Sequence, residues 1–290
     1  MNIYRDYTQA ELDSQYDNRS HVPDHEEIYK ARAEEAVAIL AKIEARFDIA
    51  FGDSAEETLD IYLPENAGNG PLPINIFLHG GYWFSRHKDD FHFLAGGLTA
   101  KGAALIIVNY ALIPSVDMTE LVRQCRAAVQ WTFDNAVTFG GDKNNIHVSG
   151  HSAGGQLTAM MMATDWPSFA DNLPADLIKS GCAISGVYEL EPIRLGFMQE
   201  TLGFSAEDVA AYSPMNLAPA TDAPLIVAVG GAETDEFIRQ SNEFAPIWQQ
   251  AGIDCSLMVV PEMNHFTILG ELAEPDSPLT NAAAKLMGLE

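Results

Sequence analysis

The residues with the clearest chemical potential are those of segment 150–155, which reads Gly-His-Ser-Ala-Gly-Gly and contains the pattern Gly-x-Ser-x-Gly. Glycines in this pattern permit a sharp strand-to-helix turn that lifts the serine hydroxyl above the edge of a sheet. The helix after such a turn points its N-terminal N–H groups at the same place. An apolar strand pattern precedes the segment and a helical pattern follows it, so the sequence predicts that Ser152 is a nucleophile.

A serine nucleophile needs a base, and His265 is the only histidine that follows Ser152 in the chain. In hydrolases built on this strand-turn-helix order, an acid and then a histidine come after the serine. His265 stands a few residues beyond the last expected strand, where a loop can reach back over the sheet edge. Elimination therefore makes His265 the predicted general base.

The acid that orients the imidazole should follow the strand expected at 225–229. The next residues, 230–237, read Gly-Gly-Ala-Glu-Thr-Asp-Glu-Phe and offer three carboxylates. Glu233 comes first after the glycine turn and is the favoured acid. Asp235 is the alternative, although it is also placed to cap the next helix, and Glu236 should already lie on that helix.

A second part of an oxyanion hole should follow the first buried strand, where the chain reads His-Gly-Gly-Tyr-Trp-Phe over 79–84. Glycines there let the backbone turn its N–H groups into the site. The predicted oxyanion-binding segment is Gly80, Gly81 and Tyr82, together with the N–H of Ala153. The adjacent rings of Tyr82, Trp83 and Phe84 are predicted to contact substrate, with core packing as the alternative for each.

Other polar clusters give weaker signals. His87 and His92 stand near Asp89 and Asp90, but the spacing lacks a third well-placed ligand of the kind that zinc sites use. The chain contains neither Gly-x-x-x-x-Gly-Lys nor Gly-x-Gly-x-x-Gly. We therefore expect no metal and no nucleotide cofactor.

The elements that must position these residues alternate regularly along the chain. Continuous Val/Ile/Leu runs that alternate with helical patterns predict a mostly parallel sheet covered on both faces, an α/β fold. Buried strands are expected at 73–79, 103–109, 145–149, 180–185, 224–230 and 255–260, with helices at 90–101, 118–137, 152–163, 235–250 and 281–287. Ligands bind at the strand carboxyl ends in such sheets, which is where the candidate residues stand.

The N-terminal part of the chain lacks this regular alternation. Residues 1–23 are polar and are expected to be irregular, whereas 24–47 are rich in Ala and Glu with apolar residues at helical spacing, which predicts one long helix. Short strands are expected at 49–51 and 58–63. We expect one domain over 1–290, with 1–47 as its lead-in and a small cap formed by the N-terminal helix and segment 188–212.

Composition limits the partners. The 290 residues carry 16 Lys and Arg against 41 Asp and Glu, a net charge of −25, and such a surface repels phosphate backbones and anionic lipids. We therefore expect no nucleic-acid and no membrane partner, and no apolar run approaches the roughly 20 residues of a membrane span. Three widely spaced cysteines and a polar N-terminus favour buried, reduced thiols and a cytoplasmic location; an oligomer is possible.

Three segments together carry a family resemblance: HGGYW at 79–83, FGGDKNNIHVSGHSAGG at 139–155, and GGAETDEFIRQS at 230–241 followed by MNHF at 263–266. They resemble the α/β-hydrolases, in particular the kynurenine formamidase (arylformamidase)-like hydrolases, neighbours of the hormone-sensitive-lipase-type carboxylesterases. In the formamidase-like pattern an acid stands three residues before EFxRQS, which corresponds to Glu233, where those relatives often have Asp.

The resemblance implies a serine hydrolase with an acyl-serine intermediate and a small ester or amide as its substrate. We favour carboxylesterase activity, because a shared triad constrains chemistry more than substrate. The alternatives are an arylformamidase acting on N-formyl aryl amides such as N-formylkynurenine, and a catalytically silent binding module.

Overall fold

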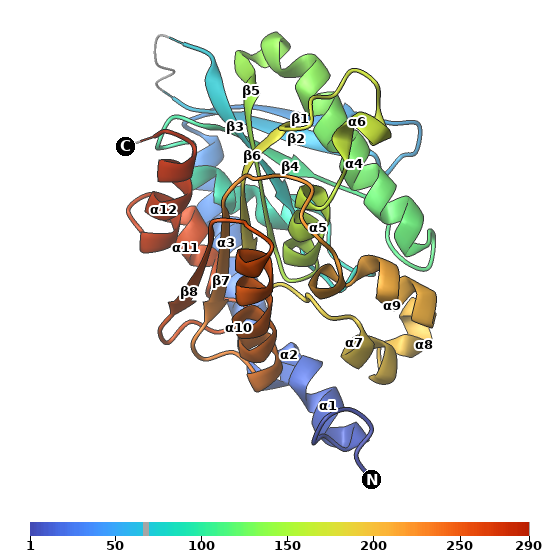
Figure 1. The fold of residues 1–290 in the computed structure, drawn as a ribbon. Helices are drawn as coiled ribbons and strands as arrows, with labels where there is room; N and C mark the ends of the chain where they lie inside the picture. The colour runs from blue at the N-terminus through green and yellow to red at the C-terminus, as the bar shows by residue number, and fades with distance from the viewer. Residues whose placement is uncertain (66–69, 290) are drawn as a thin grey trace.

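The computed structural model describes residues 1–65 and 70–289, and its centre is a sheet with the strand order β1-β2-β4-β3-β5-β6-β7-β8 (Figure 1). Strands β1 and β2 pair antiparallel, as do β2 and β4, and all other neighbours are parallel. The strands are β1 (Glu44–Ala50), β2 (Thr58–Leu63), β3 (Leu72–Leu78), β4 (Ala104–Val108), β5 (Gly141–His151), β6 (Ile178–Ile184), β7 (Leu225–Gly230) and β8 (Cys255–Val260). This confirms the predicted mostly parallel sheet.

Alternation along the central strands divides the core between the two faces of the sheet. In β4, Ile106 faces one hydrophobic cluster while Leu105 and Ile107 face the other. Since successive side chains of a strand point to opposite faces, a continuous apolar run is what a strand covered on both sides requires.

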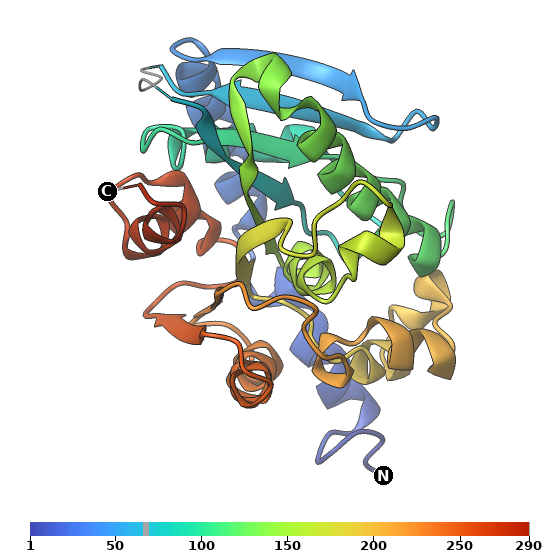
Figure 2. The same cartoon turned by 45° about the horizontal axis from the view of Figure 1, so that its top comes forward.

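Helices cover both faces (Figures 1 and 2). The first cluster contains residues of α4 (Met118–Asn135), α5 (Ala153–Met162) and α10 (Asp235–Gln250). The second contains residues of α3 (His25–Leu40), the 3₁₀ helix η1 (Lys88–Gly96), α11 (Leu269–Ala273) and α12 (Pro278–Leu286). Shorter elements are η2 (Ala136–Phe139), α6 (Trp166–Phe169) and η3 (Pro214–Asn216).

Two chain segments far apart in sequence form a cap beside the carboxyl ends of the strands (Figures 1 and 2). One consists of α1 (Gln9–Tyr16) and α2 (Asn18–His21), and the other of α7 (Glu191–Leu195), α8 (Gln199–Leu202) and α9 (Ala206–Tyr212). The Gln9 amide on α1 donates a hydrogen bond to the carbonyl oxygen of Leu195 at 3.0 Å, which joins the two. The expected cap segment 188–212 is therefore present, but its N-terminal partner is mainly α1 and α2.

The N-terminal expectations need correction in two places. Residues 1–23, expected to be irregular, contain α1 and α2, and the long helix expected over 24–47 ends at Leu40, after which 44–50 form β1. The sequence of β1, Glu-Ala-Arg-Phe-Asp-Ile-Ala, is mostly exposed and has no strong strand pattern. Pairing with β2 decides its conformation, an example of tertiary context overriding local propensity.

The helix expected at 90–101 is the 3₁₀ helix η1 at 88–96.

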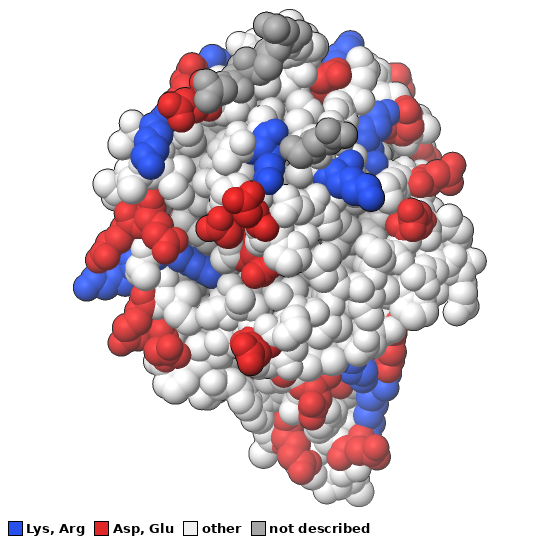
Figure 3. All heavy atoms as spheres, turned by 90° about the vertical axis from the view of Figure 1, so that its left-hand side faces the viewer, with Lys and Arg blue, Asp and Glu red and all other residues white. Residues whose placement is uncertain are grey.

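The surface is strongly acidic. On the face drawn in Figure 3, acidic side chains gather in groups around a broad uncharged region, with fewer basic side chains between them. None of the helices in the described residues is long and apolar enough to cross a membrane. All three cysteines are buried and unpaired, as predicted.

Candidate active site

Ser152 stands on a tight turn between β5 and α5. Its backbone has φ 58° and ψ −119°, a left-handed conformation that costs energy for a residue with a side chain. The flanking glycines make the turn possible: a Cβ on Gly150 would lie 2.1 Å from the carbonyl oxygen of Gly154, and one on Gly154 would lie 1.9 Å from that of Leu78. The predicted strand-turn-helix context of the serine is therefore present.

The structure brings Ser152, His265 and Glu233 together from three separate loops. His265 Nε2 lies 3.0 Å from Ser152 Oγ, and His265 Nδ1 lies 2.7 Å from Glu233 Oε2. The other carboxylate oxygen of Glu233 accepts hydrogen bonds from the Ser185 hydroxyl at 2.5 Å and the Gly230 N–H at 2.7 Å. The carboxylate is thus fully buried and fixed in orientation, which leaves Oε2 to hold Nδ1–H and present Nε2 to the serine.

Asp235, the alternative acid, takes no part in this chain of hydrogen bonds. It is exposed at the first position of α10, where an acidic side chain interacts favourably with the helix dipole. The sequence left open whether Glu233 or Asp235 is the acid beside His265, and in the structure only Glu233 contacts that histidine. Ser185, which orients Glu233, was missed because a serine after a strand has no distinctive sequence pattern.

The loop after β3 presents backbone donors beside Ser152. Gly81 has φ +120°, and the next two residues, Tyr82 and Trp83, also have positive φ values of 50° and 61°. A Cβ on Gly81 would lie 2.0 Å from the carbonyl oxygen of Ser85, so only glycine fits. Within the described residues, no hydrogen bond is donated by the N–H groups of Gly80, Gly81, Tyr82 or Ala153.

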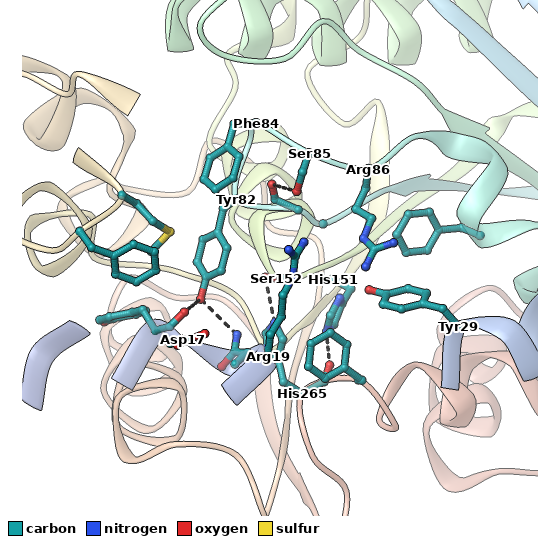
Figure 4. A pocket seen from close by; sticks show the side chains of 18 residues that line it. Asp17, Arg19, Tyr29, Tyr82, Phe84, Ser85, Arg86, His151, Ser152 and His265 are labelled. Carbon is teal, nitrogen blue, oxygen red and sulfur yellow. Dashed lines mark hydrogen bonds between the residues drawn. The ribbon is translucent and has the colours of Figure 1, made fainter. Parts of the chain in front are cut away.

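A cavity of about 280 Å³ opens onto Ser152 and His265 (Figure 4). Tyr82 and Phe84 line it, as predicted, but Trp83 does not. The Trp83 ring is fully buried, and its Nε1–H donates to Gln156 Oε1 at 3.1 Å, so this ring belongs to the core. The prediction that Trp83 contacts substrate is therefore wrong, because the positive φ turns successive side chains of the loop in different directions.

Much of the remaining lining comes from segments that sequence reasoning did not connect with the site. The N-terminal residues 16–19, Tyr29 on α3, and Phe197 and Met198 in the cap all face the cavity. The Tyr82 hydroxyl donates to the carbonyl oxygen of Tyr16 at 2.9 Å and accepts from the Asn18 amide at 3.1 Å. These hydrogen bonds attach the N-terminal segment to the oxyanion loop. The polar sequence of this segment contains no local pattern that predicts them.

Two further histidines lie close by. The His151 ring nitrogen Nε2 is 2.8 Å from the carbonyl oxygen of His265 and must donate to it, while burial holds the pKa of His151 well below its usual range. His79 is stacked on Tyr110 with ring centroids 4.2 Å apart, and burial lowers its pKa to about 4. Both rings are neutral at pH 7, and both support loops of the site.

Of the four residues that the sequence analysis weighed as a metal site, Asp89 and His92 lie instead with Asp60, beside the Lys88 amine. Asp60, Asp89 and His92 approach one another closely, but Lys88 Nζ lies 2.9 Å from Asp60 and 3.0 Å from Asp89. A third carboxylate, Asp48, is 2.7 Å from the same nitrogen. The ammonium group thus supplies the positive charge that these carboxylates require.

Comparisons with known proteins identify the family and the fold. A family model described as BD-FAE matches residues 59–188. The chain is 33% identical to a kynurenine formamidase of Danio rerio and 31% identical to that of Salmo salar, in each case over 83% of this chain and 81% of the relative. It also resembles a solved putative thioesterase of Silicibacter sp. TM1040, with 30% identity, a TM-score of 0.80, and coverage of 93% and 98% of the two chains.

The sheet order and the serine turn define the protein as an α/β-hydrolase, and esterase B of Lactobacillus rhamnosis shares the fold with a TM-score of 0.67 at 16% identity over 94% and 99% of the two chains. The chain belongs to the kynurenine formamidase family within this class. It is accordingly a hydrolase, and the predicted family resemblance is confirmed.

Proposed function

We propose that the protein hydrolyses small carboxylic esters through an acyl-serine intermediate, with Ser152 as nucleophile, His265 as base and Glu233 as the acid that orients the base. The observation that carries the proposal is the chain of hydrogen bonds from Glu233 Oε2 through His265 to Ser152 Oγ, which ends in a cavity. A catalytically silent binding module would have no need for these two hydrogen bonds.

The first half-reaction forms the acyl-enzyme. Ser152 Oγ attacks the ester carbonyl carbon while His265 Nε2 takes the hydroxyl proton. The carbonyl oxygen becomes an oxyanion, and the N–H groups of Gly81, Tyr82 and Ala153, which have no acceptor among the described residues, are the proposed donors to it. The carbon–oxygen bond to the leaving group then breaks, and the alcohol departs with the proton from His265.

The second half-reaction reverses these roles. Water attacks the acyl-serine, His265 removes its proton, and the tetrahedral intermediate collapses to a carboxylic acid and free Ser152. Throughout, the buried Glu233 carboxylate stabilises the imidazolium form of His265.

A second candidate is hydrolysis of N-formyl aryl amides, favoured by the two relatives named kynurenine formamidase. The formyl group is the smallest acyl group, and a cavity of about 280 Å³ with aromatic walls suits an aryl leaving group. The same residues would act, and the leaving amine would take its proton from His265.

A parallel assay tests both candidates. The purified protein is given p-nitrophenyl acetate and N-formylkynurenine, and kcat/KM is measured for each beside labelling by a fluorophosphonate probe. A higher kcat/KM for the ester supports the first proposal, and a higher value for the formamide moves the function to the second. Failure to turn over either, with no labelling of Ser152, would refute the serine hydrolase mechanism.

A further inference from the structure

His151 is a residue of the site that the two half-reactions described above do not use. It precedes Ser152 in the chain, its side chain is buried, and it lines the same cavity as Ser152 and His265 (Figure 4). The centre of its ring lies 4.6 Å from the centre of the His265 ring. Two imidazole rings therefore border the cavity at the nucleophile, and only one of them has a role so far.

The two ring nitrogens of His151 have different surroundings. Nε2 lies 2.8 Å from the carbonyl oxygen of His265, which can only accept, so Nε2 carries the proton. Burial holds the pKa of His151 well below its usual range, so the ring is neutral at pH 7 and Nδ1 is an acceptor. Nδ1 has no hydrogen-bond donor among the described residues, yet it is not sealed off from solvent. The ring thus presents one unused acceptor to the cavity.

Gly80 shows where this acceptor lies relative to the nucleophile. A Cβ on Gly80 would be 3.3 Å from His151 Nδ1 and 3.0 Å from Ser152 Cβ, so both groups border the same small space. The same Cβ would be 2.8 Å from the carbonyl oxygen of His151, closer than side chains approach. Glycine at position 80 therefore keeps the space beside Nδ1 and Ser152 open.

We propose that His151 is a further catalytic residue, whose Nδ1 accepts a hydrogen bond from the water molecule that attacks the acyl-serine. This role rests on the proposed function and adds a second protein group to its second half-reaction. One proton of the water passes to His265 Nε2 as the oxygen bonds to the acyl carbon. The other O–H stays intact, bonded to His151 Nδ1, and becomes the O–H of the carboxylic acid. Ser152 Oγ then leaves the carbon and takes the proton back from His265.

Two acceptors orient a water molecule better than one. A water about 2.8 Å from each acceptor can span neighbouring rings, and both of its hydrogens are then fixed while a lone pair remains for the acyl carbon. Held by His265 alone, the water could rotate about that single bond. Acylation has no such requirement, because the attacking group is the Ser152 hydroxyl, whose one hydrogen already bonds to His265. Loss of His151 Nδ1 should therefore slow deacylation and spare acylation.

Measuring the two steps separately tests the proposal. The protein is mixed rapidly with p-nitrophenyl acetate, and the first turnover of p-nitrophenolate release gives the acylation rate. Chemical quenching followed by intact-protein mass spectrometry gives the rate at which the acetyl group is lost from Ser152. Methanol is added in a second series, and the yields of methyl acetate and acetic acid are compared.

Two substitutions divide the functions of the His151 ring. His151→Gln places an amide N–H near the position of Nε2, which keeps the donor to the carbonyl oxygen of His265 and removes Nδ1. His151→Asn places an amide oxygen near the position of Nδ1 and removes that donor. The matched control is His147→Gln, because His147 is also buried on β5 but has partners for both nitrogens, Ser180 Oγ at 2.6 Å and Asn145 Oδ1 at 2.8 Å.

We expect His151→Gln to lower the deacylation rate about tenfold and to change the acylation rate by less than about threefold. As a result kcat and KM should fall together while kcat/KM is nearly unchanged. His151→Asn should keep the wild-type ratio of the two rates, and His147→Gln should change neither rate. Methanol has one O–H and cannot bond to both rings, so it should capture a larger share of the acetyl groups in His151→Gln than in the wild type.

An equal fall of both rates in His151→Gln would give His151 a structural role only, and an unchanged deacylation rate would remove it from the reaction. Either result overturns the proposal, as does a selective loss of deacylation in His151→Asn. The serine mechanism is judged separately, by formation of acetyl-Ser152 in the wild type. Absence of that intermediate, with no fluorophosphonate labelling, would refute the mechanism itself.

Discussion

Two clusters of titratable groups among the described residues contain a buried carboxylate and invite comparison, but only one of them has the features of a reaction centre. At the carboxyl ends of the strands, Glu233 binds His265 and His265 binds Ser152. Beside β2 and η1, Lys88 binds three aspartates, of which Asp60 is completely buried.

The two clusters differ in where their hydrogen bonds end. The Lys88 ammonium donates to three carboxylates, and these hydrogen bonds raise the pKa of Lys88 although burial alone would lower it. The first cluster instead ends at the Ser152 hydroxyl, which faces a cavity beside backbone N–H groups that have no acceptor in the described part of the chain. A buried polar cluster can act on a substrate only where some of its bonding capacity remains unused and faces a cavity.

Removing the nucleophile is expected to have the largest effect. Ser152→Ala should lower kcat by roughly 10³ to 10⁶, since the members of a triad act as a unit. A fluorophosphonate probe should label the wild type at Ser152 and leave the variant unlabelled. Labelling of another residue, with full activity in the variant, would contradict the mechanism.

Substitution of the two candidate acids separates an effect on catalysis from an effect on the stability of α10. Glu233→Gln keeps the shape but removes the charge that stabilises the imidazolium, so kcat should fall by up to roughly 10⁴. Asp235→Asn should cost on the order of 1 kcal/mol of stability or less, because it removes only the interaction of one exposed charge with the dipole of α10. The measurement is kcat and Tm for both; normal turnover in Glu233→Gln with collapse in Asp235→Asn would exchange their roles.

A substitution in the Lys88 cluster should lower the stability of the fold and leave kcat unchanged. Lys88→Met leaves the buried Asp60 carboxylate without its cation, which should lower the free energy of unfolding by about 3 kcal/mol. The control is Lys101→Met. Lys101 Nζ lies 3.2 Å from Asp276, whose side chain is 87% exposed, so the loss of this ion pair should change the free energy of unfolding little. Urea unfolding of both variants checks this; a loss of kcat with unchanged stability in Lys88→Met would place that cluster in the reaction.

The smallest effect concerns the size of the cavity. Because it measures about 280 Å³ and has aromatic walls, we expect kcat/KM to peak at short acyl chains. In a series of p-nitrophenyl esters, the value for a twelve-carbon chain should be roughly tenfold below that for a two- to four-carbon chain, a difference of about 1.4 kcal/mol. A maximum at long chains would show that the cap moves away from the position it has here.

The sequence determined the alternation of strands and helices along the chain, and it also singled out Ser152 and His265 as the candidate nucleophile and base, because these features depend on local signals. Apolar runs, the spacing around Ser152 and the absence of any other histidine after it are all visible in the chain. The favoured acid, Glu233, was also reached, but only as one of two open possibilities. Local chemistry could not choose between two carboxylates that are two residues apart.

The tertiary structure alone decided the features that depend on long-range contact. Pairing with β2 turned 44–50 into a strand, and hydrogen bonds to Tyr82 and Thr234 placed the polar N-terminal segment across the site. The backbone of the oxyanion loop sent Trp83 into the core and left Tyr82 at the cavity. Arg19 and Arg86 face one cavity although 66 residues separate them, because chain folding and not sequence spacing sets which charges share a low-dielectric site.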